Sequence, residues 1–164
     1  MKKIILLLLC FTALFSACEK KQTSASDVLD LVLRRDIVPY TKRYVYGVPE
    51  HSDMYLSTER CESLYGCDIY ELCNDFAIAL SKKDLIAEIH VFFAKDADKK
   101  KRLCEIFNER IEVLSGKELY IYDQGEAESI NAQIFEKGLC IIMIAGIDGD
   151  LANKELQNAL TNLE

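Results

Sequence analysis

The first eighteen residues decide which part of this chain can fold. Two lysines precede an apolar run over residues 4–14, and two small residues stand directly before Cys18. A basic start, an apolar run and small residues at the end are the three parts of a secretory signal peptide. We therefore predict that residues 1–17 are a signal that is removed, and that the folded protein begins after it.

The cysteine at the end of this segment resembles that of a lipobox. In bacterial lipoproteins such a cysteine is acylated and becomes the new N-terminus, and two or more acyl chains attach a protein stably to a membrane. Phe15 stands where a lipobox usually has a small aliphatic residue. The resemblance implies lipidation of Cys18 and a protein anchored on the extracytoplasmic face of the cell membrane.

Two other interpretations of the segment stay open. A transmembrane anchor needs ~20 apolar residues, and the run here is shorter. A protein cut near Ala17 without acylation would be a soluble secreted protein. With lipidation, the chain divides into a signal (1–17), a lipidated cysteine with a polar tether (18–25) and a single α+β domain (26–164).

The remaining chain is long enough for one domain with its own core. The full chain carries a formal charge of −7, and loss of Lys2 and Lys3 with the signal makes the mature protein more acidic. An acidic protein has no electrostatic reason to bind nucleic acid. The one basic run, residues 99–102, is expected to be a solvated helix face. We expect the membrane to be a partner through the lipid, and an envelope protein as a further partner.

Cysteine usage adds a second constraint. The chain has seven cysteines, and five remain after the signal and the lipidated position are set aside: Cys61, Cys67, Cys73, Cys104 and Cys140. An odd number on an exported protein cannot all pair internally. Cys104 and Cys140 fall on apolar faces, where free cysteine behaves as a small hydrophobe. A Cys61–Cys67 or Cys67–Cys73 bridge stays open.

The N-terminal part of the domain is predicted to be helical. Ser24, with Asp27 three residues later, has the pattern of a capping box and begins an amphipathic helix over residues 26–35. Pro39 and Pro49 punctuate a tyrosine-rich stretch that we expect to be irregular or partly extended.

Most other elements follow from hydrophobic periodicity and turn residues. A short helix begins at residues 57–60 and ends at Gly66, a residue that suits a left-handed cap. The later elements are two hairpins, each followed by a helix. They are strands 76–81 and 85–94, a helix from Asp96 or Asp98 to about Gly116, strands 130–135 and 139–145, and a helix from about Asp148.

This order, β-β-α-β-β-α after a helical segment, predicts an α+β fold. We expect a two-layer sandwich with a mostly antiparallel four-stranded sheet and helices packed on one face. Residues 140–144 are apolar at every position, which predicts a central strand. In the strand over 85–94, Ile89 and Val91 face the core, while Glu88 and His90 lie on the opposite, mixed face.

Several segments resemble one lipoprotein family. They are Leu-Tyr-Gly-Cys-Asp at 64–68, Ala-Glu-Ile-His-Val-Phe-Phe-Ala-Lys-Asp at 87–96, Arg110 on the helix that follows, and the closing pair of strands. The family is that of Firmicutes, largely clostridial, lipoproteins catalogued as domain of unknown function 4358, and the resemblance covers residues 26–160. It implies one lipid-anchored domain, and a core position for Cys67. The family has no established catalytic set, so it implies no functional residues.

No recognised catalytic motif is present in the sequence. The two histidines, His51 and His90, stand in no motif, and there is no phosphate-binding glycine loop and no nucleophile elbow. We therefore expect a non-catalytic binding or interaction module, without a cofactor, that exposes an apolar or aromatic patch. Glu88 and His90 on the mixed sheet face are the candidate ligand or partner surface.

Metal or small-ligand binding is the alternative function. Cys61, Cys67 and Cys73, with His51 upstream, are the residue types that bind zinc or copper. Their five-residue separations differ from the two to four intervening residues usual in structural zinc sites. This hypothesis predicts that the three cysteines converge in the fold.

Overall fold

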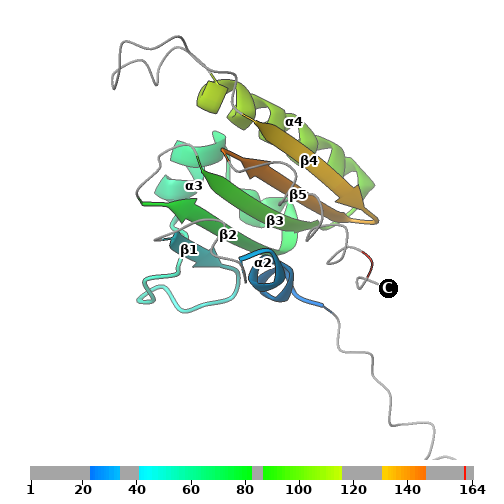
Figure 1. Ribbon diagram of the computed structural model, residues 1–164. Coiled ribbons are helices and arrows are strands. Elements are labelled where there is room, and N and C mark those ends of the chain that lie inside the picture. The colour runs from blue at the N-terminus through cyan, green and yellow to red at the C-terminus, as the bar shows by residue number, and fades with distance from the viewer. Residues whose placement is uncertain (1–22, 34–40, 83–86, 116–130, 147–160, 162–164) are drawn as a thin grey trace, which may run out of the picture.

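The protein is an α+β fold built on a five-stranded antiparallel sheet (Figure 1). The computed structural model describes residues 23–33, 41–82, 87–115, 131–146 and 161. The signal, Cys18 and most of the helix predicted from Asp148 lie outside the described residues. The strands are β1 (Thr41–Val45), β2 (Cys73–Ser81), β3 (Glu88–Ala94), β4 (Ala132–Lys137) and β5 (Cys140–Ala145), in the spatial order β1-β2-β3-β5-β4.

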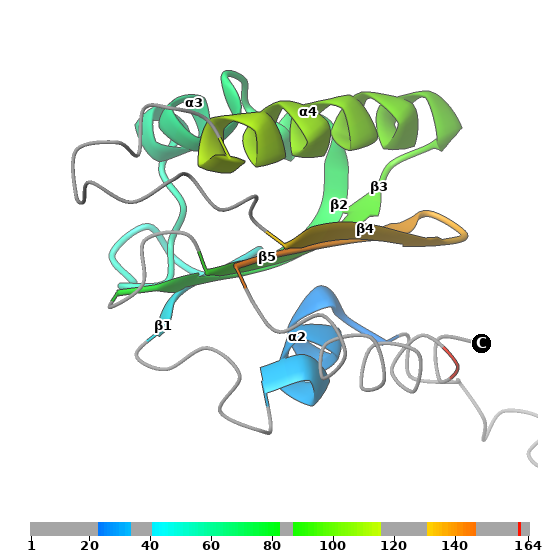
Figure 2. The same ribbon diagram turned by 45° about the horizontal axis from the view of Figure 1, so that its top comes forward.

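Helices cover both faces of the sheet, which corrects the prediction of two layers. They are α2 (Ala25–Leu33), α3 (Thr58–Tyr65), the short 3₁₀ helix η1 (Ile69–Glu71) and α4 (Ala97–Ser115). Figure 2 shows α2 on one side of the sheet and α3 with α4 on the other. The described residues therefore form three layers, with β3 at the middle of the sheet.

The two-sided packing explains the composition of the central strands. On the α2 side, Ile89 and Val91 of β3 join a core with Val28 and Val32 of α2. On the opposite side, Phe92 packs with residues of α3 and α4. Every residue of β5 is buried, as expected for an interior strand that is apolar throughout.

Strand β1 is the main element that the sequence prediction missed. Residues 41–45 lie in the stretch expected to be irregular or partly extended, but they pair antiparallel with β2, with Tyr44 opposite Ile78. Among the described side chains of this strand, only that of Tyr44 is buried. The strand conformation of β1 therefore depends on its hydrogen bonds to β2. The sheet has five strands where four were predicted.

Three predicted helix caps are confirmed, at the start of α2, the end of α3 and the start of α4, whereas the ends predicted near residue 35 and at Gly116 lie outside the described residues. The Ser24 hydroxyl accepts a hydrogen bond from the Asp27 N–H at 3.1 Å, and the Asp27 carboxylate accepts one from the Ser24 N–H at 3.1 Å, which completes the capping box. Gly66 has φ 66° and donates its N–H to the Glu62 carbonyl. The Asp96 side chain accepts from the Lys99 N–H at 2.8 Å and caps α4.

Candidate functional site

Four polar side chains form a continuous hydrogen-bonded chain beneath α3 and α4. Arg110 of α4 donates from Nε to Oε2 of Glu88 at 3.0 Å, and from its Nη2 to Oε1 of the same carboxylate. His90 Nε2 lies 3.0 Å from Glu88 Oε2, and His90 Nδ1 lies 2.7 Å from the Tyr65 hydroxyl. The chain therefore runs from Arg110 through Glu88 and His90 to Tyr65.

The sequence placed Glu88 and His90 together correctly, but it was wrong about their surroundings. Alternation along β3 puts both side chains on one face of the sheet. That face was expected to be a partly open surface, yet Glu88 is 3% exposed and His90 is 0% exposed. Their burial follows from α3 and α4, which cover this face, and so these two residues do not form a ligand or partner surface.

The electrostatics assign a protonation state to each member of the chain. Burial alone would raise the pKa of Glu88, but hydrogen bonds from His90 and Arg110 outweigh it and lower that pKa to about 2. Burial lowers the pKa of His90, against the opposing effect of Glu88. Burial, together with the Glu88 charge, raises the pKa of Tyr65 well above its usual value.

These pKa shifts determine which atoms donate and which accept each hydrogen bond. A neutral His90 donates its Nε2 proton to the Glu88 carboxylate, which leaves Nδ1 as the acceptor for the Tyr65 hydroxyl. The charges of Arg110 and Glu88 then cancel, so the four hydrogen-bonded side chains together carry no net charge. Among the described residues, every buried side-chain nitrogen and oxygen has a hydrogen-bond partner.

The arrangement has the order of a nucleophile, a base and an orienting carboxylate, but its nucleophile is poor. The Tyr65 hydroxyl is buried, and its raised pKa keeps it protonated. Its ring packs edge-on against the rings of His90 and Phe92. These four hydrogen-bonded side chains are therefore suited to holding α3 and α4 on the sheet rather than to chemistry on a substrate.

The cysteines do not form a metal centre. Among the described residues, which include His51 and all five cysteines that follow Cys18, no three His, Cys, Asp or Glu side chains are grouped so that they could hold a metal ion. The five cysteines are free thiols, without the bridge that the sequence left open. Burial raises the pKa of Cys61 to about 11 and also raises those of Cys67 and Cys73. Soft metals bind the thiolate, so the raised pKa values of these thiols do not favour the metal hypothesis.

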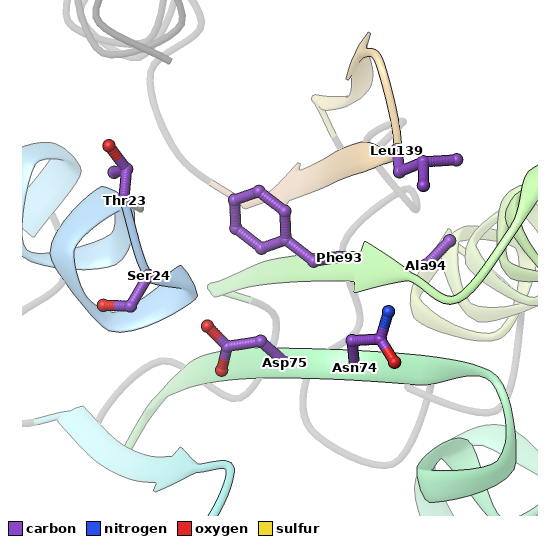
Figure 3. Close-up of a pocket in the computed structure, with 7 residues that line it drawn as sticks. All are labelled: Thr23, Ser24, Asn74, Asp75, Phe93, Ala94 and Leu139. Carbon is purple, nitrogen blue, oxygen red and sulfur yellow. The ribbon is translucent and has the colours of Figure 1, made fainter. Parts of the chain in front are cut away.

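A pocket of about 400 Å³ opens at the N-terminal end of α2 (Figure 3). Its lining comes from the start of α2, the paired strands β2 and β3, and the turn between β4 and β5. The residues are Thr23, Ser24, Asn74, Asp75, Phe93, Ala94 and Leu139. Sequence reasoning did not find this site, because its residues come from four separate segments and no motif joins them.

Local structure explains how the pocket forms. The pairing of β2 with β3 shifts register between Cys73 and Asp75, an irregularity of the bulge type that redirects side chains at the strand end. The Asp75 carboxylate accepts a hydrogen bond from the Ala25 N–H at 2.7 Å and so joins β2 to the first residue of α2. Figure 3 shows the Phe93 ring between the start of α2 and the β4–β5 turn.

The chemistry of the pocket is mixed. Asp75 is the only charged residue among the described residues of the lining, and Thr23, Ser24 and Asn74 add hydroxyl and amide groups. Phe93, Ala94 and Leu139 supply an apolar wall. Such a combination suits a small ligand that has an apolar part and a cationic or hydrogen-bond-donating group.

Comparisons with known proteins find no matching family model, no similar curated protein and no similar solved structure. The resemblance to clostridial lipoproteins therefore stays a prediction. Within the described part of the chain, no helix is long and apolar enough to cross a membrane.

Proposed function

We propose that this chain is a lipid-anchored lipoprotein of the extracytoplasmic membrane face, and that its domain is a non-catalytic binding module that takes a small ligand in the pocket at the start of α2. The binding role is supported by the contrast between this open pocket and the buried hydrogen-bonded side chains of Arg110, Glu88, His90 and Tyr65. The groups with the chemistry of an active site are buried and satisfied, whereas the pocket presents polar and apolar groups to solvent.

The signal and the cysteine after it support the anchor. An apolar run with small residues before Cys18 has the order that lipoprotein processing requires. Acylation there would attach a domain whose first described residue, Thr23, lies only a few positions later. The pocket includes Thr23, so part of the ligand site lies only five positions after the proposed anchor.

Metabolic labelling tests the anchor. Cells that express the full chain are grown with an alkyne-bearing fatty acid, and the protein is then recovered from the membrane fraction. We expect label on the wild-type chain and none on Cys18→Ala, with the mature N-terminus at Cys18. Cleavage without label, or label that persists in Cys18→Ala, would refute the lipoprotein assignment.

A matched pair of probes tests the pocket. Phenethylamine and phenylacetate share a phenyl group and carry opposite charges, and ligand-observed NMR reports binding of each to the full chain. We expect phenethylamine to bind and phenylacetate to bind at least several-fold more weakly, because the Asp75 carboxylate attracts a cation and repels an anion.

Asp75→Asn is the control for this measurement. The amide keeps an oxygen that can accept from the Ala25 N–H, but it removes the charge. We expect the preference for the amine to disappear in this variant while the fold is retained. Equal binding of both probes to the wild-type chain, or an amine preference that Asp75→Asn leaves unchanged, would contradict the assignment of the pocket.

A further inference from the structure

The end of the domain that faces the membrane can be identified from the length of the tether. Only residues 19–22 separate Cys18 from Thr23. A fully extended residue spans at most about 3.6 Å, so Thr23 lies within ~18 Å of the lipidated cysteine. This inference rests on the proposed lipidation of Cys18. Such a short tether holds the start of α2 close to the lipid headgroups.

The β4–β5 turn lies at the same end of the domain as the start of α2. Asp75, which accepts from the Ala25 N–H, is paired with Phe93 across β2 and β3, and Phe93 is paired with Cys140 at the beginning of β5. Leu139 in the turn lines the same pocket as Thr23. The Ala94 N–H donates to the Leu139 carbonyl at 2.9 Å, which fixes the turn beside the end of β3.

The first turn of α4 completes this end. Lys100 of α4 forms an ion pair with Glu136 of β4 at 2.7 Å, next to the β4–β5 turn. Figure 2 shows the beginning of α4 and the β4–β5 turn on the same side of the molecule. At the other end of α4, Arg110 contacts Glu88, which is paired with Ala145 at the far end of β5.

The surface chemistry of this end differs from that of the whole chain. Leu139 is an apolar side chain at a turn and is 41% exposed. In the described segments that form this end, residues 23–27, 74–75, 93–101 and 136–139, lysines equal carboxylates in number, although the chain as a whole carries a charge of −7. The lysines are Lys95, Lys99, Lys100, Lys101 and Lys137, and the carboxylates are those of Asp27, Asp75, Asp96, Asp98 and Glu136.

We propose that this end, made of Thr23, the β4–β5 turn and the first turn of α4, rests on the membrane that carries the anchor. Leu139 inserts at the level of the headgroups, and the lysines lie against anionic phospholipid, which attracts basic side chains close to its surface. The pocket then opens toward the membrane surface, so its ligand is a molecule presented there.

Tryptophan fluorescence tests the orientation, because the chain contains no tryptophan. The lipidated full chain is reconstituted in vesicles of equal phosphatidylcholine and phosphatidylglycerol, with and without brominated acyl chains that quench indole. Leu139→Trp reports from the proposed contact. Val113→Trp is the control, since Val113 is 51% exposed and lies near the other end of α4, ~24 Å from Ala97 along the helix.

We expect brominated lipid to reduce the emission of Leu139→Trp at least two-fold and to leave that of Val113→Trp unchanged. Asn74→Trp, an exposed pocket residue at the same end, is a second reporter in case Leu139→Trp fails to fold, and it should also be quenched. Vesicle flotation of each variant accompanies the measurement.

The outcomes separate the anchor from the orientation. Flotation with no quenching at Leu139 and Asn74, or with equal quenching at Val113, would overturn the orientation and leave the anchor intact. Failure of the wild-type chain to float would show that the anchor itself is absent, and the orientation would fall with it.

Discussion

Arg110 and Glu88 meet through two hydrogen bonds across the boundary between α4 and β3, and both side chains are largely removed from solvent. A guanidinium that contacts a carboxylate through two N–H groups fixes both the distance and the orientation of the partners. The pair joins the only long helix of the described residues to the middle strand of the sheet. Glu88 also accepts from His90, so the pair extends to Tyr65 on α3.

Removal of one partner from this pair should strongly lower the free energy of unfolding. Arg110→Met leaves the Glu88 carboxylate buried without its cation, and breaking a buried pair in this way typically costs about 3–5 kcal/mol. We expect a fall of that size in the free energy of unfolding, measured by urea denaturation. Arg102→Met is the matched control, because Arg102 pairs with Glu105 and Glu109 on the exposed face of the same helix. Its effect should be far smaller, because exposed ion pairs contribute little to stability, and equal losses would contradict the prediction.

Acid should weaken the fold through two groups. The folded pKa of Glu88 is lowered to about 2 from its ordinary value of 4.5, so the stability it contributes is present above pH 4.5 and is lost as pH falls toward 2. The pKa of His90 is also lowered in the folded state, from 6.5, so the unfolded chain takes up a proton first and stability declines as pH falls below 6.5.

Urea denaturation between pH 3 and pH 8 measures this dependence. We expect the free energy of unfolding to fall on the acid side, and the part below pH 4.5 to shrink in Glu88→Gln, which cannot titrate at that position. A wild-type profile that rises on acidification from pH 6.5 would contradict the assigned states. Nitrogen-15 NMR of the His51→Ala chain, which retains only His90, should show the Nε2-protonated tautomer at pH 7.

The hydroxyl of Tyr65 should contribute through one buried hydrogen bond. Tyr65→Phe keeps the ring contacts but leaves the Nδ1 acceptor of His90 without a donor, and an unsatisfied buried group costs about 1–3 kcal/mol. Tyr70→Phe is the comparison, since its hydroxyl donates to the Leu56 carbonyl at a partly exposed position and should lose less. A thermal or urea unfolding series distinguishes the two. An equal or smaller loss in Tyr65→Phe would show that the His90 contact is weak.

Thiol reactivity should follow burial. Cys61, Cys73 and Cys140 are buried, and burial raises the pKa of each thiol, to about 12 for Cys140. We expect Cys67 and Cys104, which are partly exposed, to be alkylated by iodoacetamide first, with site assignment by mass spectrometry. All five should react once the protein is unfolded in urea. A bridge that survives unfolding, or joint protection of Cys67 with Cys61 and Cys73, would revive the disulfide or metal hypothesis.

Much of the secondary structure could be predicted from local patterns in the sequence. The capping pair of Ser24 and Asp27, the cap at Gly66 and the start of α4 depend on contacts within a few residues, so each could be predicted from spacing alone. Strands β2, β3 and β5 were found because their apolar runs are long. In contrast, β1 has few buried side chains, and its identity as a strand depends on hydrogen bonds to β2, which is distant in the sequence.

The sequence by itself determined which residues of β3 share a face, because side chains alternate along any strand. Only the tertiary structure decided whether that face was open. The placement of α3 and α4 over Glu88 and His90, and the approach of Asp75 to Ala25 from 50 positions away, depend on packing between elements that no local pattern encodes. For this reason Glu88 and His90, which were predicted to lie at a surface, are buried and connect the helices to the sheet. For the same reason the pocket is lined by residues that belong to no sequence motif.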